Sequence, residues 1–178
     1  MTVSPHQPFS TIVIDLFPLH LYNMRMEIKI VNKDEFFNNA EFFKKNLGYV
    51  FNINKRLPKI YDLMFNGFSR VYNYKDNFLV IACDNKRIYS IASFEFEDGI
   101  WMIDSVSTRE EFRGKGLATK VLKAGMKQKK VDFSLHVNKN NTVAFNLYKK
   151  LGFEIDSTHP KQLDGSFFMT KSQKTLEK

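Results

Sequence analysis

Polar and apolar residues alternate where the readable part of the chain begins, and this alternation predicts a strand at 27–31. The run Glu27-Ile28-Lys29-Ile30-Val31 has the period of two that is typical of a half-buried strand. Asn32 or Asp34 can cap a helix that follows, because either side chain accepts a hydrogen bond from a free backbone N–H. We expect Gly48 to end this helix. Its apolar residues recur at helical spacing and are Phe36, Phe37, Ala40, Phe43 and Leu47.

A second helix is expected after Pro58, and it adds apolar residues to the first half of the chain. Ile60, Leu63, Met64 and Phe68 fall on one side of it. The aromatic side chains of these two helices suit either a hydrophobic core or a substrate pocket. Helical spacing already explains core packing, so we favour the core.

Beyond residue 77 the pattern changes to short apolar runs separated by turn residues. Asp84-Asn85-Lys86 and Asp98-Gly99 are turn sequences that join such runs into a meander. The predicted strands are 78–83, 87–97, 100–106, 133–137, 153–156 and 166–170, and the predicted helices are 116–129 and 141–151. This order predicts a mixed α/β (α+β) fold. A chain of 178 residues suits a single domain.

The two ends of the chain stand apart from this domain, which we place at residues 26–172. Residues 1–25 contain three prolines and form an N-terminal extension of unclear role. They either lie outside the fold or add an edge strand at 11–17, where β-branched residues gather. Residues 173–178 are predicted to be a polar, frayed tail.

Basic residues outnumber acidic ones, with 27 Lys and Arg against 19 Asp and Glu, for a formal net charge of +8. Such a charge favours anionic ligands and non-specific binding to nucleic acid. We find no basic patch interleaved with aromatic residues, so a nucleic-acid partner is not favoured.

Other classes of site are not favoured either. The single cysteine, Cys83, allows no internal disulfide and suits a reducing cytoplasm. It follows the apolar run 78–82, so we expect a buried, inert thiol. No run of about 18 uncharged apolar residues is present, so no membrane span is expected. The four histidines are scattered, and we expect no metal site.

The segment Arg113-Gly114-Lys115-Gly116-Leu117-Ala118 lies between a predicted strand and a predicted helix. Glycine lets the backbone adopt a positive φ and lets a ligand approach it closely. The first turn of a helix presents free N–H groups and carries roughly half a positive charge. The segment therefore predicts an anion site that suits a phosphate group.

Two motifs in this half of the chain resemble those of the GNAT (Gcn5-related N-acetyltransferase) family. The family's pyrophosphate loop, Arg/Gln-x-x-Gly-x-Gly/Ala, is matched by Arg113, Gly116 and Ala118. Its second motif is matched by Asn141, Ala144, Tyr148, Gly152 and Phe153. The resemblance implies a mixed, mostly antiparallel sheet that is splayed near its middle, with helices on both faces.

The resemblance also implies roles for individual residues toward acetyl-CoA. The pantetheine chain would pair with the strand at Val106, Ser107 and Thr108, where a backbone N–H would polarise the thioester carbonyl. The pyrophosphate would lie on the N–H groups of Gly114, Lys115, Gly116, Leu117, Ala118 and Thr119, beside Arg113. Tyr148 would protonate the departing thiolate. Asn141 would bind pantetheine, cap its helix, or do both.

The general base is open between three candidates. His136 lies on the face of its strand opposite Phe133, Leu135 and Val137, and histidine's reference pKa of about 6.5 suits proton abstraction at neutral pH. Asp104 precedes Val106 by two residues. Many family members use an ordered water instead. A purely structural role for His136 is the main alternative.

The predicted function is therefore N-acetyl transfer from acetyl-CoA to a primary amine by direct attack, in a monomer or homodimer. The aromatic first half of the chain matches no acceptor pocket that we can name. The acceptor is therefore open between a small molecule and a protein. The alternative is a module that binds coenzyme A without catalysing a reaction.

Overall fold

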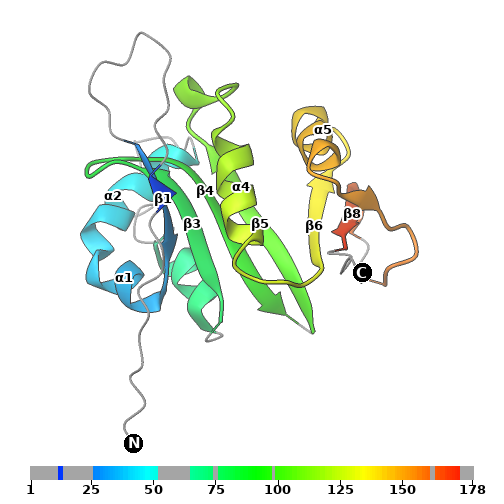
Figure 1. Ribbon diagram of the computed structural model, residues 1–178, viewed down its shortest axis with the longest axis horizontal. Coiled ribbons are helices and arrows are strands. Elements are labelled where there is room, and N and C mark those ends of the chain that lie inside the picture. The colour runs from blue at the N-terminus through cyan, green and yellow to red at the C-terminus, as the bar shows by residue number, and fades with distance from the viewer. Residues whose placement is uncertain are drawn as a thin grey trace, which may run out of the picture.

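A computed structural model describes residues 12–13, 26–51, 65–73, 76–97, 99–160 and 163–172. The strands are β1 (Ile12–Val13), β2 (Glu27–Val31), β3 (Phe78–Cys83), β4 (Ile88–Glu97), β5 (Ile100–Thr108), β6 (Phe133–Asn138), β7 (Glu154–Ile155) and β8 (Ser166–Lys171). They form one sheet in the order β1-β2-β3-β4-β5-β6-β8-β7 (Figure 1). Neighbouring strands are antiparallel except β5 and β6, which are parallel. The mixed, mostly antiparallel sheet predicted from the sequence is confirmed.

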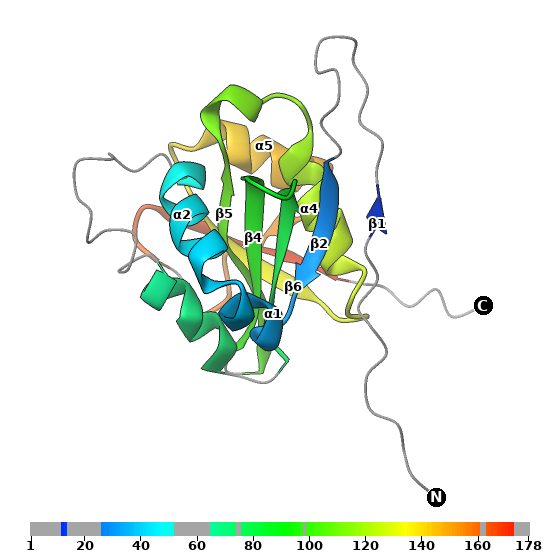
Figure 2. The ribbon, with the colours of Figure 1, turned by 90° about the vertical axis from the view of Figure 1, so that its left-hand side faces the viewer.

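Helices cover both faces of this sheet (Figures 1 and 2). They are α1 (Lys33–Asn38), α2 (Ala40–Val50), α4 (Leu117–Met126) and α5 (Thr142–Lys150), with short 3₁₀ turns η1 (Arg70–Asn73) and η2 (Glu110–Phe112). Side chains of α1 and α2 pack with one set of strand residues, and those of α4 and α5 pack with the other set. Two hydrophobic cores therefore lie on opposite faces of the sheet.

Aromatic rings fill the core under α1 and α2, as expected from their helical spacing. Phe36 is fully buried and its ring stacks on Phe65 at a centroid distance of 4.8 Å. The rings of Phe43 and Tyr72 also contact the ring of Phe36. Phe37 is the exception, because 43% of its surface stays exposed.

The prediction of one helix that begins after Asn32 or Asp34 and ends at Gly48 is wrong in two respects. It is two helices, because the Asn39 side-chain amide donates to the carbonyl of Glu35 at 2.7 Å and interrupts the helix there. It also continues past Gly48 to Val50, since buried Asn46 bonds the hairpin at Lys86 and Ile88 and holds this end in place. Of the two predicted caps, Asn32 is the one used.

Some predictions fall partly outside the described residues. The structure has β1 within the predicted edge strand 11–17, paired with β2, and describes nothing else of residues 1–25. The second predicted helix is described only from residue 65, where 65–69 are helical. The tail 173–178 is not described. In the described part, no helix has the length and apolar character needed to cross a membrane.

Close packing of α4 on the sheet predicts the effect of one substitution. A Cβ at Gly125 would overlap the ring of Phe94, which is fully buried and stacked on Phe78. Overpacking costs up to about 3 kcal/mol, which exceeds the gain of about 1 kcal/mol in helix propensity. Gly125→Ala should therefore lower the free energy of unfolding by about 2 kcal/mol, measured by urea denaturation.

Gly67→Ala is the matched control, because an added Cβ there meets nothing within 4 Å. Alanine at this helical position should leave stability unchanged or raise it slightly. Equal effects of the two substitutions would contradict the close approach of α4 to Phe94.

Candidate functional site

Strands β5 and β6 are paired only where they begin. Trp101 pairs with Phe133 and Met102 with Ser134, and no further pair joins the two strands in the described residues. β6 also pairs along its whole length with β8 through its other edge, and Figure 1 shows β5 and β6 diverging. The edge of β5 from Ile103 to Thr108 is thus left without a neighbouring strand. Such an edge can pair with an extended ligand.

A β-bulge bends β5 along this free edge. Ser93 of β4 lies opposite Asp104 and Ile91 lies opposite Ser107, so one residue of β4 faces two residues of β5. Within the bulge Ser105 has φ of 50°, which is uncommon for a residue other than glycine. Bulges are frequent next to active sites because they redirect the strand. The Ser107 hydroxyl fixes the bulged strand by donating to the carbonyl of Val50 at 2.7 Å.

The loop after η2 leads into α4 through two glycines with positive φ. Gly114 has φ of 74° and Gly116 has φ of 75°, and both face open space. Gly116 is the N-cap of α4, with no side-chain cap and no acidic residue in the first turn. The first N–H groups of the helix therefore have no side-chain acceptor, as an anion site requires. Arg113 folds back so that its Nε donates to the carbonyl of Thr108 at 3.2 Å.

Tyr148 projects from α5 into the core and is 6% exposed. Burial raises the pKa of Tyr148 to about 12, and the negative charge of Asp104 adds to this shift. Asp104 itself is exposed on β5. Its effect on Tyr148 means that the two side chains lie within electrostatic reach across the divergence of β5 and β6.

His136 lies on β6, on the opposite face from the core that Phe133, Leu135 and Val137 share with α4 and α5. Its ring centroid is 5.0 Å from that of Phe168, its partner on β8. The ring of His159 stacks on the same phenylalanine at 4.1 Å. This arrangement could not be predicted from the sequence, because it depends on the pairing of β6 with β8.

Asn141 caps α5, the helix that carries Tyr148. Its side-chain oxygen accepts a hydrogen bond from the N–H of Ala144 at 3.1 Å. One of the two roles suggested by the sequence is therefore present. The other end of α5 is held by Lys171, whose ammonium donates to the carbonyl of Leu151.

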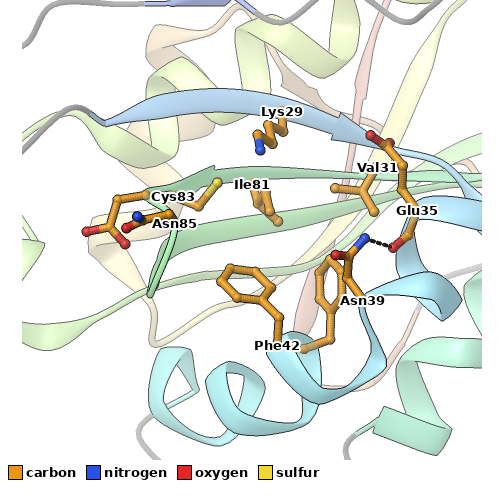
Figure 3. Close-up of a pocket in the computed structure, with 10 residues that line it drawn as sticks. Lys29, Val31, Glu35, Asn39, Phe42, Ile81, Cys83 and Asn85 are labelled. Carbon is orange, nitrogen blue, oxygen red and sulfur yellow. Dashed lines mark hydrogen bonds between the residues drawn. The ribbon is translucent and has the colours of Figure 1, made fainter.

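A separate pocket of about 260 Å³ lies between β2, β3 and helices α1 and α2 (Figure 3). Its wall includes Cys83, which is 1% exposed, and burial raises the pKa of this thiol to about 12. The expected buried thiol is confirmed, and its high pKa keeps it protonated and unreactive. Because β4 separates this pocket from β5, it is distinct from the site described above.

Potential metal ligands do not gather in the described residues. No three His, Cys, Asp or Glu side chains among them are placed to hold a metal ion. The chemistry available at the site is that of a free strand edge, an open helix N-terminus, a buried phenol, a carboxylate and an imidazole.

Comparisons with known proteins agree with this geometry. The family model described as the Acetyltransferase (GNAT) family matches residues 37–153, which is more than half of the chain. No protein of curated function matches the chain at a significant level.

Solved structures of acetyltransferases share the fold. PaiA N-acetyltransferase from Thermoplasma acidophilum, in complex with coenzyme A, is 16% identical with a TM-score of 0.58, over 84% of this chain and 99% of that one. An acetyltransferase from Streptococcus agalactiae is 15% identical with a TM-score of 0.62, over 83% and 98%. Aminoglycoside 6'-acetyltransferase type Ii is 16% identical with a TM-score of 0.61, over 82% and 96%.

The cap of α5 yields a prediction about stability. Asn141→Ala removes the acceptor for the Ala144 N–H and should lower the free energy of unfolding by about 1 kcal/mol. Asn141→Asp keeps a capping oxygen and should retain stability. Equal losses in the two variants, measured by urea denaturation, would show that the cap does not stabilise the helix.

Proposed function

The chain belongs to the GNAT acetyltransferase family, and we propose that it transfers an acetyl group from acetyl-CoA to a primary amine by direct attack. The observation that carries this proposal is the grouping of three features around the divergence of β5 and β6. These are the free edge of β5, the uncapped N-terminus of α4 and the buried hydroxyl-bearing side chain of Tyr148. They correspond to the parts of acetyl-CoA that must be held: pantetheine, pyrophosphate and thioester sulfur.

The free edge of β5 would hold the pantetheine through the backbone of Val106, Ser107 and Thr108. Extended amides pair well with an open strand edge. The residues 114–119 would hold the pyrophosphate through their N–H groups, with the positive charge of Arg113 beside it. The coenzyme A complex of the Thermoplasma relative supports this choice of cosubstrate.

In the proposed reaction the amine nitrogen attacks the thioester carbonyl, and the carbon–sulfur bond then breaks. A backbone N–H at Val106 would stabilise the negative oxygen that forms, a contribution of about 3 kcal/mol when well aimed. The amine loses a proton to a base and the sulfur gains one from an acid. No acyl-enzyme is needed, so no nucleophilic side chain takes part.

Tyr148 is the proposed acid. With its pKa raised to about 12 it stays protonated throughout the physiological range, so a proton is always available to the sulfur. A thiol normally has a pKa of about 8.5, so transfer from such a phenol is uphill in water. The thiolate would form beside the buried hydroxyl of Tyr148, where burial and the nearby negative charge of Asp104 would raise its own pKa as well. Tyr148 therefore acts as a hydrogen-bond donor that completes the transfer as the charge on sulfur builds up.

The proposed base is His136, with Asp104 or an ordered water as the other candidates. Asp104 has a second use, because its carboxylate attracts an acceptor that arrives as an ammonium ion. The chain as a whole has a net charge of +8, and this carboxylate places a negative charge on β5 that favours a cationic amine at its free edge.

The phosphate site is tested by Gly116→Glu. This change places a side chain at φ of 75° and a negative charge where the pyrophosphate is proposed to bind. We expect loss of acetyl-CoA binding in a calorimetric titration. Gly165→Glu is the matched control, because Gly165 has φ of 77°, also faces open space and lies in the β7–β8 connection. Unchanged affinity in Gly116→Glu, or equal losses in both variants, would contradict the assignment.

The proposed acid is tested by Tyr148→Phe. Removing the hydroxyl should lower kcat by about 10²-fold or more, while the Kd of acetyl-CoA stays nearly constant because the ring still packs. Thiol release during turnover provides the rate and calorimetry provides the affinity. Full turnover in this variant would exclude Tyr148 as the acid. Tight binding with no turnover in the unmodified protein, for any amine tested, would favour a non-catalytic coenzyme A-binding module.

A further inference from the structure

We propose that Tyr89 is a positioning residue for the phosphate-binding loop, and that Asp84 in the β3–β4 hairpin turn holds Tyr89 in place. Neither residue belongs to the motifs that resemble the GNAT family. The inference rests on the proposed function only for the identity of the ligand that the loop binds. The contacts that support it are those of the protein alone.

The first link is the carboxylate of Asp84. One of its oxygens accepts hydrogen bonds from the N–H groups of Lys86 and Arg87, at 2.7 and 2.6 Å. The other accepts the hydroxyl proton of Tyr89 at 2.6 Å. Burial alone would raise the pKa of Asp84, but the hydrogen bonds from Tyr89 and the turn backbone outweigh it and lower the pKa. The Asp84 carboxylate is therefore charged, and its hydrogen bonds to the turn backbone hold it in place for the hydroxyl of Tyr89.

The second link is the packing of Tyr89 against the segment before the loop. Tyr89 is fully buried, and its ring centroid lies 4.5 Å from that of Phe112. Its carbonyl accepts the N–H of Arg109 at 2.9 Å. Tyr89 thus contacts both ends of η2, the turn that delivers the chain to the loop.

The third link joins Phe112 to the loop. Phe112 directly precedes Arg113 and is 7% exposed, and the ammonium of Lys115 lies 4.8 Å from its ring centroid. Cβ atoms added at Gly114 and Gly116 would have no neighbour within 4 Å, so the loop is open at its two glycines. Phe112 therefore supports the start of the loop, together with the hydrogen bond from Arg113 Nε to the carbonyl of Thr108.

Such support matters because an anion site works best when its N–H groups are aimed before the ligand arrives. A loop with two glycines at positive φ has many alternative conformations. The ring of Phe112 and the backbone of Arg109 restrict these by fixing where the loop starts. The Asp84–Tyr89 hydrogen bond restricts them in turn by fixing the orientation of the Tyr89 ring.

The test compares Tyr89→Phe with Tyr72→Phe. Both changes remove one buried hydroxyl, because Tyr72 donates to the carbonyl of Val31 at 2.8 Å in the core under α1 and α2. Both should lower overall stability, and Tyr89→Phe should do so more, because Tyr89 donates to a carboxylate and Tyr72 to a neutral carbonyl. Only Tyr89→Phe should speed amide hydrogen exchange in the ligand-free protein at the amides that are hydrogen-bonded on either side of the loop, which are Arg109, Phe112, Arg113 and Lys120. The expected change is about tenfold, the loss expected for one hydrogen bond to a charged group.

The same pair of variants is then titrated with acetyl-CoA. Tyr89→Phe should raise the Kd about tenfold with kcat nearly unchanged, and Tyr72→Phe should change neither. Exchange that is unchanged in Tyr89→Phe at the amides on either side of the loop, or equally faster in both variants, would overturn the proposal. If the unmodified protein fails to bind acetyl-CoA, the proposed function fails, while the exchange experiment still decides the role of Tyr89.

Discussion

Two residue pairs join β5 to β6, and the divergence that follows determines most of the site. If the strands had stayed paired, the backbone groups along this edge of β5 would be hydrogen-bonded to β6, and no extended ligand could pair with them. The divergence also leaves room for Tyr148 on α5 to lie within electrostatic reach of Asp104 on β5. Pairing of β6 with β8 along its whole length, through the edge that faces away from β5, keeps the second half of the sheet intact. The parallel direction of β5 and β6 follows from the α4 crossover, which returns the chain to the same end of the sheet.

The site carries positive and negative charges within a short stretch of chain. Arg113, Lys115 and the start of α4 make the end of β5 positive, which suits phosphate. Asp104, a few residues earlier, makes the middle of β5 negative, which suits an ammonium ion. The bulge at Ser105 separates the two regions and bends the strand between them. A substrate pair with an anionic donor and a cationic acceptor fits this arrangement.

Much of the fold was readable from local patterns. The bounds of β2 and β3 match the prediction, and Gly116 and Asn141 begin their helices as expected, because each depends on short-range spacing or capping. The break at Asn39 was missed because it depends on one side-chain hydrogen bond that competes with the helix. The bulge at Ser105 and the stacking of His159 on Phe168 depend on strand register, which a single sequence does not display. The loop motif was visible as a local pattern. Its support by Tyr89 and Asp84 was not, because these residues lie far from the loop in the sequence. The roles of the individual site residues toward acetyl-CoA stay predictions.

Hydrogen exchange with and without acetyl-CoA tests whether the cosubstrate lies along the free edge of β5 and on the loop that follows. We expect slower exchange at residues 103–108 and 114–119 when acetyl-CoA is present, with no change in β2 and β3. Protection confined to the pocket beside Lys29 and Cys83, or no protection at all, would contradict this placement.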